Sequence, residues 1–264
     1  MFKLGTSGVD NLNGGDGSDT FFMTANNFVT DTVNGGPGSD TIDYSVSNVG
    51  VHITLFDMRR YDFVSSGVVE ADFVTTTYNP AARSYIQMSN HQVVANLTNI
   101  ENAVGSAYDD VLTGNNLANV LNGGAGNDII DGGYGADTII GGAGHDTMTG
   151  GGGDDKFVFQ HAADGPMSTA YSAMDTVTDF VRGEDKIDLH ALVNETTGNH
   201  ALSYIDGGSF TGIAGQVNSV FTGYGWLVKA DLNGDRVADF QALVHSSTDF
   251  EMHQHLQASD FILV

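Results

Sequence analysis

A nine-residue repeat of glycine and aspartate constrains this sequence more than any other feature. From Gly105 the chain divides without a slip into the units GSAYDDVLT, GNNLANVLN, GGAGNDIID, GGYGADTII, GGAGHDTMT and GGGGDDKFV. The sixth place of each unit is Asp or Asn, and the eighth is always apolar. A period of nine with one apolar residue fits neither an amphipathic helix nor a long alternating strand. It predicts a six-residue turn followed by a strand of about three residues whose inward side chain is the apolar eighth.

The N-terminal region carries the same repeat less strictly. Its units are GTSGVDNLN from Gly5, GGDGSDTFF from Gly14, NNFVTDTVN from Asn26 and GGPGSDTID from Gly35. Two units complete one coil, so alternate sixth places are expected to stack in two columns. The sixth-place residues of all the copies are Asp10, Asp19, Asp31, Asp40, Asp110, Asn119, Asp128, Asp137, Asp146 and Asp155. Among them, Asp110, Asp128 and Asp146 share one predicted column, and Asn119, Asp137 and Asp155 share the other.

Stacked carboxylates need a cation between the coils, because unpaired like charges repel at close range. Glycine permits the positive φ angles that turn backbone carbonyls inward. Carbonyl and carboxylate oxygens make a hard site with six or more ligands, which suits Ca²⁺ better than Mg²⁺ or a transition metal. A solvated Asx turn explains an isolated copy equally well, but tandem repetition favours several Ca²⁺ ions. The turn glycines predicted at these sites are Gly124, Gly126, Gly133, Gly135, Gly142, Gly144, Gly151 and Gly153.

The tandem array resembles the RTX (repeats-in-toxin) family of calcium-binding proteins. The resemblance implies an all-β fold built on a right-handed parallel β-roll. It also implies that each sixth-place Asp supplies a carboxylate ligand and that carbonyls of the glycine turn complete the shell. Asn119 departs from this pattern, as do the turns GSAYDD and GNNLAN, which lack the second and fourth glycines.

Further segments carry a second resemblance. They are FVF from Phe157, DTVTDFVRGEDKIDLHAL from Asp175, the ending ASDFILV, and LTNIENAVGSAYDDVLTGN from Leu97. These are similar to the C-terminal part of serralysin-type secreted proteins, which include metalloproteases and polysaccharide-modifying enzymes. The resemblance implies a roll over residues 1–160 and a β-rich, sandwich-like cap over residues 161–264. It also implies that Asp175 and Asp179 help to close the last calcium sites, with a solvated strand as the alternative reading of these acids.

Composition limits the partners of this chain. It has 33 Asp and Glu against 9 Lys and Arg, a formal net charge of -24, so nucleic acid is not an expected partner. It has no cysteine, which excludes disulfides and Cys-ligated zinc. No apolar segment is long enough to span a membrane.

The two ends of the sequence bear on export. The N-terminus lacks the apolar run of a cleavable signal peptide. The ending SDFILV resembles the uncleaved C-terminal signal of the serralysin family, which a type I (ABC transporter) secretion machine reads. That resemblance implies a protein secreted to the outside of a bacterial cell, although FILV also reads as a terminal core strand.

Residues 51–96 interrupt the repeat and suggest a possible enzyme site. Arg, His and Tyr side chains together can bind and deprotonate an anionic sugar, as in epimerases and lyases that act on uronates. The candidate catalytic residues are His52, Arg60, Tyr61 and His91, and the candidate partner is an extracellular polysaccharide or a cell surface. Residue type alone shows no geometry, so ordinary loop and strand surface is the competing reading. The chain has no HExxH motif, so the protease activity of serralysins is not implied.

Two other segments suggest metal sites. DLNGDRVAD from Asp231 spaces its acids like the first ligands of an EF-hand loop, but Arg236 stands where that loop requires glycine. A hairpin turned at Asn-Gly is the favoured reading. His253 and His255 lack a third partner and are better read as surface polarity.

Three functions follow from these observations. The favoured one is a secreted calcium-binding module that folds on extracellular Ca²⁺ and serves binding or structure. The second is an extracellular polysaccharide-modifying enzyme of the uronate epimerase or lyase type, with its site in residues 51–96. The third is the C-terminal module of a larger secreted enzyme.

Overall fold

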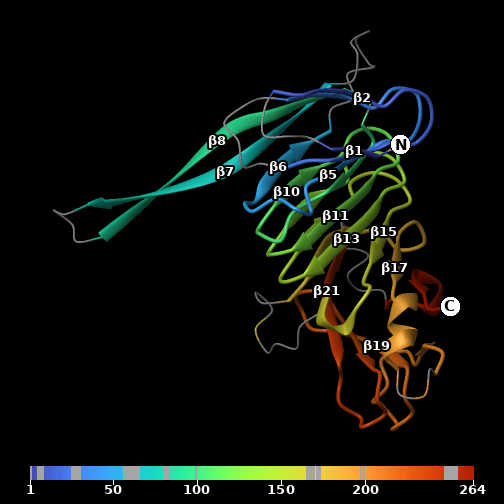
Figure 1. Ribbon diagram of the computed structural model, residues 1–264. Helices are drawn as coiled ribbons and strands as arrows, with labels where there is room; N and C mark the ends of the chain where they lie inside the picture. Colours follow the sequence, from blue (N-terminus) through green and yellow to red (C-terminus); the bar gives the residue numbers. More distant parts are fainter. Residues whose placement is uncertain are drawn as a thin grey trace.

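The computed structural model describes most of the chain. The described residues are 2–4, 9–24, 31–55, 66–79, 84–98, 100–164, 170, 174–196, 198, 200–246 and 255–264. They are nearly all strand, with short 3-10 helices at η2 (Ala162–Asp164), η4 (His190–Glu195) and η6 (Ala258–Asp260). No helix of this part is long and apolar enough to cross a membrane. The strands form two stacked sheets, so the predicted all-β parallel β-roll is confirmed (Figure 1).

The first sheet contains only parallel strand pairs. In spatial order its strands are β1 (Phe2–Leu4), β3 (Thr20–Phe22), β5 (Thr41–Asp43), β9 (Asn102–Val104), β11 (Val120–Ala125), β13 (Thr138–Ala143), β15 (Lys156–Val158), β17 (Lys186–Asp188) and β22 (Phe261–Ile262). This spatial order follows the sequence, as expected when the chain winds forward one coil at a time. The two ends of the chain therefore lie at opposite edges of this sheet.

The second sheet mixes roll strands with two antiparallel units of three strands each. In spatial order its strands are β2 (Asn11–Asn13), β4 (Asp31–Asn34), β8 (Ser84–Thr98), β7 (Ser66–Asn79), β6 (Val51–Thr54), β10 (Val111–Thr113), β12 (Ile129–Asp131), β14 (Thr147–Thr149), β16 (Thr176–Phe180), β21 (Phe240–Ser246), β20 (Trp226–Asp231), β19 (Gln216–Phe221) and β18 (Ser203–Tyr204). The antiparallel pairs are β6 with β7, β7 with β8, β19 with β20 and β20 with β21.

The core of the roll is a stack of eighth-place side chains between the two sheets. Three-residue strands can point only one side chain inward, because successive residues face opposite sides of a sheet. Leu112, Leu121, Ile130, Ile139 and Met148 are all fully buried in this way. Each coil therefore contributes two apolar side chains to the core, and a coil is stable only when neighbouring coils cover it.

The segment 51–96 is partly roll and partly hairpin. Its first strand, β6, pairs in parallel with β10 and so belongs to the stack. The strands β7 and β8 then form a long hairpin that extends away from the roll (Figure 1). The end of β8 returns to the stack, where it pairs in parallel with β4.

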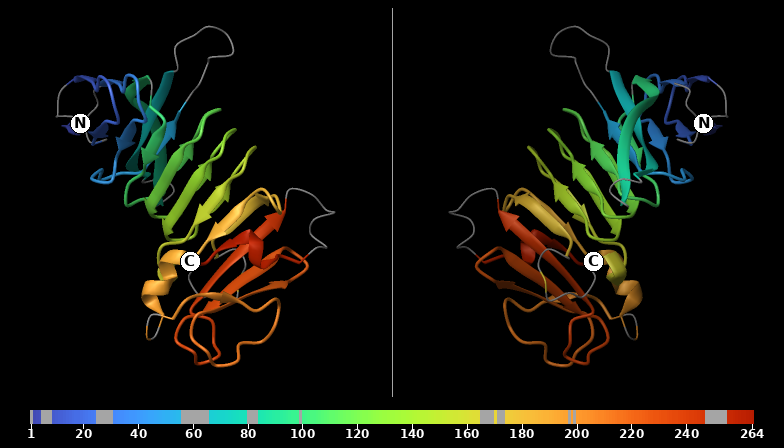
Figure 2. Two further views of the ribbon diagram at one scale, coloured as in Figure 1. Left: turned by 90° about the vertical axis from the view of Figure 1, so that its right-hand side faces the viewer. Right: turned by 90° about the vertical axis from the view of Figure 1, so that its left-hand side faces the viewer.

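Both sheets run from the roll into the C-terminal region. In the first sheet, β17 pairs with β15; in the second, β16 pairs with β14 (Figure 2). Beyond β16 the second sheet becomes antiparallel, and aromatic side chains replace the small core residues of the roll. The rings of Phe159 and Phe240, for example, meet edge to face at 5.1 Å. The boundary at residue 160 stays a sequence prediction, because the sheets cross it without a break.

Candidate metal centre

The sixth-place residues stack in two columns, as the repeat predicts. In the first column the N–H groups of Asp110, Asp128 and Asp146 donate to Oδ1 of Asp128, Asp146 and Asp175 at 2.7, 2.8 and 2.9 Å. In the second column those of Asn119, Asp137 and Asp155 donate to Oδ1 of Asp137, Asp155 and Asp185 at 2.7, 2.9 and 2.9 Å. One carboxylate oxygen of each Asp therefore ties its coil to the coil before it.

In most of these carboxylates the second oxygen has no hydrogen-bond partner among the described residues; Asp185 is the exception, because its Oδ2 accepts from the N–H of Val181 at 2.7 Å. The buried oxygens without a partner include Oδ2 of Asp40, Asp128, Asp137, Asp146, Asp155 and Asp175. Each of these side chains is at most 1% exposed. A buried anionic oxygen without a partner is costly, since it has lost its water and gained nothing in exchange. Both columns thus present oxygens that a bound cation would satisfy.

Glycine carbonyls surround these oxygens. A Cβ atom on Gly142 would collide with the carbonyl oxygen of Gly124, so the two turns lie in direct contact. A Cβ on Gly123 would collide with Asp128 Oδ2 and lie 2.7 Å from the carbonyl oxygen of Gly141. The predicted turn glycines all have φ between 93° and 146°, a region that favours glycine. They are Gly124, Gly126, Gly133, Gly135, Gly142, Gly144, Gly151 and Gly153.

Burial dominates the electrostatics of the columns. Together with a smaller contribution from neighbouring carboxylates, it raises the pKa of Asp128 and of Asp175 to about 8. Burial likewise raises the pKa of Asp137 to about 7 and that of Asp146 to about 6. Without a cation these carboxylates therefore hold protons at pH values where an ordinary Asp is charged.

The donor set fits calcium. Within the described ranges no three His, Asp or Glu side chains converge on one point. That agrees with shells made mostly of backbone carbonyls, each completed by a carboxylate. Such all-oxygen shells of high coordination number suit Ca²⁺. The turn glycines and the sixth-place acids would hold the ions between successive coils.

In the two turns that depart from the consensus, protein groups form hydrogen bonds with both polar ends of the sixth-place side chain. In the first, Ser106 donates through its backbone N–H to Asp110 Oδ2 and through its hydroxyl to Asp110 Oδ1. In the second, Asn119 Nδ2 donates to the carbonyl oxygen of Glu101 at 2.6 Å. Its Oδ1 accepts from the N–H of Asn115 at 2.8 Å. Protein groups therefore occupy positions that are unsatisfied in the consensus turns, and Asp110 as a calcium ligand stays a prediction.

The N-terminal acids continue the same two columns. The N–H groups of Asp10 and Asp19 donate to Oδ1 of Asp31 and Asp40 at 2.8 and 2.7 Å. Asp40 in turn donates to Glu101 Oε2 at 2.9 Å. The sequence analysis missed Glu101, which occupies the sixth place of a degenerate unit, NLTNIENAV. The signal that marks it is the apolar Ala103 two residues later, which is fully buried.

The last coils use four acids, of which the sequence analysis named two. Asp175 continues the first column, and its role as a ligand of the last calcium site stays a prediction. Asp179 accepts instead from the N–H groups of Gly150 and Gly151 at 2.9 and 2.8 Å, so it caps the last glycine turn. Asp185 was missed, yet it continues the second column. Asp164, also missed, is buried, and its negative charge helps to raise the pKa of Asp146 and Asp175.

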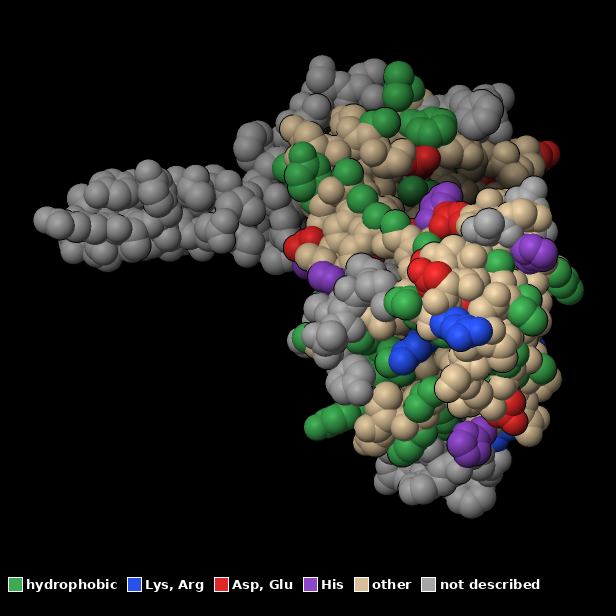
Figure 3. Space-filling view, turned by 90° about the horizontal axis from the view of Figure 1, so that it is seen from below, with side chains coloured by type: hydrophobic (Ala, Val, Ile, Leu, Met, Phe, Trp, Pro, Cys, Tyr) green, Lys and Arg blue, Asp and Glu red, His purple; other side chains and the backbone are tan. Residues whose placement is uncertain are grey.

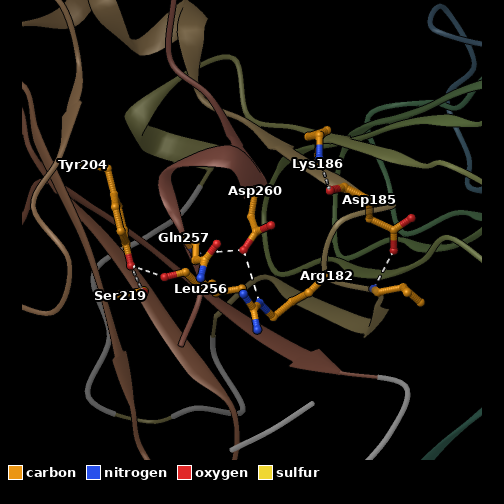
Figure 4. Close-up of polar contacts among 9 residues, drawn as sticks. Arg182, Asp185, Lys186, Tyr204, Ser219, Leu256, Gln257 and Asp260 are labelled. Atoms are coloured by element: carbon orange, nitrogen blue, oxygen red, sulfur yellow. Dashed lines mark hydrogen bonds and ion pairs between the residues drawn. The ribbon is translucent and has the colours of Figure 1, made fainter. Parts of the chain in front are cut away.

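An arginine closes the second column. Arg182 lies in the turn before Asp185, and its Nε is 3.4 Å from Asp260 Oδ2 (Figure 4). Asp260 is 2% exposed at its side chain and also accepts from the N–H of Gln257 at 2.8 Å. Beyond the last column residue, a guanidinium thus supplies the positive charge near a buried carboxylate.

The candidate catalytic residues are not assembled within the described part of the chain. Arg60 and Tyr61 lie outside the described residues. His91 lies in β8, opposite Asp72, and only its backbone is described. His52 is half-buried on β6, where it pairs with Val111 of β10. The polysaccharide enzyme therefore stays a hypothesis from the sequence.

The DLNGDRVAD segment forms the favoured hairpin. It joins β20 to β21, which pair antiparallel. Asp231 accepts from the N–H groups of Gly234 and Arg236 at 2.7 and 2.9 Å, and Asp239 accepts from that of Leu232 at 2.7 Å. These carboxylates stabilise the turn itself.

Of the two C-terminal histidines, His253 lies outside the described residues.

The fold and the columns together define a class of protein. Short parallel strands coil around an apolar core, and glycine turns between them carry rows of buried carboxylates. This is a calcium-binding RTX β-roll, and residues 4–22 and 30–45 match the RTX calcium-binding nonapeptide repeat family.

The particular family follows from the larger match. Residues 87–263 match the family described as peptidase M10 serralysin C terminal, and the chain belongs to it. The chain is 46% identical over 168 residues to a serralysin of Proteus mirabilis, and this match covers 61% of this chain and 33% of that protein. It therefore spans about a third of the length of that relative. Proteins of the serralysin and RTX families are secreted.

Two solved structures share part of the sequence. They are subunits of the mannuronan C5-epimerase of Azotobacter vinelandii, each 28% identical to this chain. The matches cover 60% and 61% of this chain, and 80% and 91% of the two subunits, with TM-scores of 0.43 and 0.44.

Proposed function

We propose that this chain is a calcium-triggered folding module that serves as a binding or structural element outside the cell. The observation that supports this most strongly is the pair of carboxylate columns. Each consensus coil places a buried carboxylate oxygen without a protein partner beside the carbonyls of a glycine turn. Metal binding to such sites is coupled to folding, because the sites exist only when coils are stacked.

The energetic consequence is a switch set by calcium concentration. Without calcium, desolvation and repulsion in the columns oppose the fold, and the turn glycines favour the unfolded chain through backbone entropy. With calcium, a site that is filled at 100 times its dissociation constant adds about 2.7 kcal/mol of stability. Several such sites in one cooperative stack suffice to convert an unstable fold into a stable one.

Export fits the same scheme. In the proposed route, the chain stays unfolded in a low-calcium cytosol and leaves through a type I secretion machine that reads SDFILV. In the folded protein this ending is structured, since β22 pairs with β17 and Phe261 is 7% exposed. The folded state therefore withholds the segment that the machine would read. Folding only after export avoids that conflict.

A calcium titration tests this proposal. Circular dichroism of the purified chain should show a large gain of β signal as Ca²⁺ rises into the millimolar range, and a chelator should reverse it. Mg²⁺ at equal concentration is the control and should produce little folding, because it prefers a small octahedral shell. A spectrum and melting temperature that do not change with calcium would overturn the proposal.

A further inference from the structure

The C-terminal region contains a polar cavity that lies outside the calcium columns. Its volume is about 470 Å³, and its lining includes Gly208, Phe210, Asn218, Lys229, Arg236 and Val237. The floor is the sheet of β19, β20 and β21, on the side that faces away from the core. Val217, Val228 and Ala242 point into the core, so the alternate residues point toward the cavity.

A row of polar residues crosses this floor. Asn218 lies directly opposite Lys229, and Lys229 lies opposite Gln241 on the next strand. An outward row at the centre of a sheet would ordinarily be solvated. Here Asn218 is 5% exposed and Gln241 is 3% exposed, because the 207–210 segment and the hairpin after β20 cover them. The row is therefore built into a recess.

Asn218 presents an acceptor without a donor. Its Nδ2 donates to the carbonyl oxygen of Gly208 at 2.7 Å, which fixes the orientation of the amide. Its Oδ1 is then left buried with no hydrogen-bond partner among the described residues. An unsatisfied buried acceptor costs about 1–3 kcal/mol. A ligand that brings an O–H or N–H group to this oxygen would recover that cost.

Two of the chain's few cations line the same cavity. The side chain of Lys229 forms no ion pair or hydrogen bond within the described part of the chain. Arg236 is anchored through Nε to the carbonyl oxygen of Thr211 at 3.2 Å, which leaves its terminal nitrogens for another acceptor. The nearby Asp231 and Asp239 already accept backbone hydrogen bonds of their own turn. Figure 3 looks onto this end of the molecule and shows exposed blue cationic groups there.

We propose that this cavity binds a hydroxylated carboxylate of the sugar-acid type. The carboxylate would pair with Lys229 and Arg236, and a ligand hydroxyl would donate to Asn218 Oδ1. The half-buried Phe210 and the exposed Val237 supply apolar wall for the C–H face of a sugar ring. The volume lies within the usual range for small-molecule sites. A neutral sugar lacks the charge that this site requires, acetate lacks the hydroxyl donor, and phosphate lacks the apolar ring face.

Binding of D-glucuronate to the calcium-loaded full chain tests the proposal. Calorimetry should give saturable binding, and amide NMR signals of Gly208 and Val220 should shift with it. D-glucose, acetate and phosphate are the comparison ligands, and each should bind at least tenfold more weakly than glucuronate. Absence of saturable glucuronate binding would refute the site. Phosphate binding of equal strength would refute the sugar-acid assignment.

Variants locate the binding. Lys229→Met keeps the length of the side chain, and Arg236→Gly removes a guanidinium from a residue at φ 74°, where glycine is unstrained. Each should weaken glucuronate binding at least tenfold. Lys156→Met, which removes a half-buried lysine from β15, is the matched control and should leave binding unchanged. If both cavity variants melt like the parent in calcium and still bind glucuronate at full strength, the inference is wrong. The calcium titration is read separately, so failure here leaves the proposed folding switch untouched.

Discussion

Each column aspartate divides its two oxygens between different partners. Oδ1 of Asp128 accepts from the backbone N–H of Asp110 in the coil before it. Oδ2 faces glycine carbonyls and has no donor among the described residues, so only a cation or a proton can satisfy it. The same side chain is thus a structural cap at one oxygen and a metal ligand at the other. Substitutions that change one oxygen separate these roles.

Asp128→Asn should weaken calcium binding while sparing the calcium-free protein. An amide oxygen still accepts the bond from Asp110, but the site loses a negative charge, so the calcium midpoint should rise at least about tenfold. In chelator the variant should melt no lower than the parent, because an uncharged amide replaces a carboxyl whose ionised form is destabilised by burial. Calcium titrations followed by melting curves measure both effects. Asp154→Asn is the control, since Asp154 is exposed and outside the columns; equal shifts in the two variants would contradict the prediction.

The calcium-free protein should lose stability as pH rises. Burial raises the pKa of Asp128 and Asp175 to about 8 and that of Asp137 to about 7, against an unperturbed value of 3.8. The folded state therefore binds more protons than the unfolded state between about pH 4 and pH 8, and its stability falls across that window. Denaturant unfolding in chelator at a series of pH values measures this. In saturating calcium the trend should reverse, because calcium displaces those protons; the same slope in both conditions would count against it.

At the scale of the element, the consensus unit is a turn with two glycines at positive φ and a strand too short to be stable alone. Two constraints act on the turn at Gly142. Its φ of 102° lies in the left-handed region, and its Cα lies against the carbonyl of Gly124. The two constraints differ in consequence, because strain in φ is local whereas a displaced carbonyl disturbs a ligand of the neighbouring site.

Three glycine substitutions distinguish these constraints. Gly183→Ala meets no atom within 4 Å but has φ of 86°, so it should cost about 1–2 kcal/mol and leave calcium affinity alone. Gly142→Ala adds the collision, so it should cost more and also raise the calcium midpoint. Gly152→Ala, at a third place that Ala125 and Ala143 occupy in other turns, puts a Cβ 3.0 Å from the ring of Tyr134, and because that ring is exposed and can move, the cost should be small. Melting temperatures at several calcium concentrations measure all three, and equal calcium midpoints for Gly142→Ala and Gly183→Ala would be inconsistent with this reasoning.

The sequence predicts the β-roll well because each place of the repeat corresponds to one position in a turn or strand of the coil. A period of nine with one apolar place leaves a single solution, and the two columns through Asp128 and Asp137 follow from it. Glu101 and Asp185 were missed because their units have lost the paired glycines, although the carboxylate and the buried residue two places later survive. The hydrogen bonds that satisfy Asn119 and Asp110 were not predictable, since they depend on how Asn115 and Ser106 are oriented in three dimensions. The cavity at Asn218 brings together strands whose pairing no repeat encodes.

At the scale of the whole molecule, the two sheets pass from the repeats into the C-terminal region and are closed there. The second sheet continues into the antiparallel strands β21, β20 and β19 and ends in β18, which pairs in parallel with β19, and the first sheet ends in β22 beside β17. The second column, which lies beside the first sheet, ends at Arg182 and Asp260, whose side chains are 14% and 2% exposed. A permanent cation thus stands beside the final carboxylate, where it is independent of the calcium concentration.

Arg182→Met should loosen the C-terminal strand without removing a calcium site. Loss of the guanidinium leaves Asp260 buried with only backbone donors, which should cost about 1–3 kcal/mol. Amide hydrogen exchange at Phe261 and Ile262 should speed up, while the number of bound calcium ions should not change. Lys156→Met, whose lysine lies on the same sheet, is the control. Unchanged exchange at β22 would show that the pair contributes little to closure.

The column hydrogen bonds all run in one direction, so the two ends of the stack are not equivalent. In both columns the N–H groups of sixth-place residues are covered by the carboxylate of the coil that follows, as at Asp10, Asp110, Asp137 and Asp155. A coil added at the N-terminal side finds its acceptors already in place, whereas a coil at the C-terminal side must have a successor. The C-terminal region is therefore the part on which the coils stack one after another, and the number of coils can vary only at the N-terminal end. In the proposed route of export, the C-terminal region is also the first part of the chain to meet calcium.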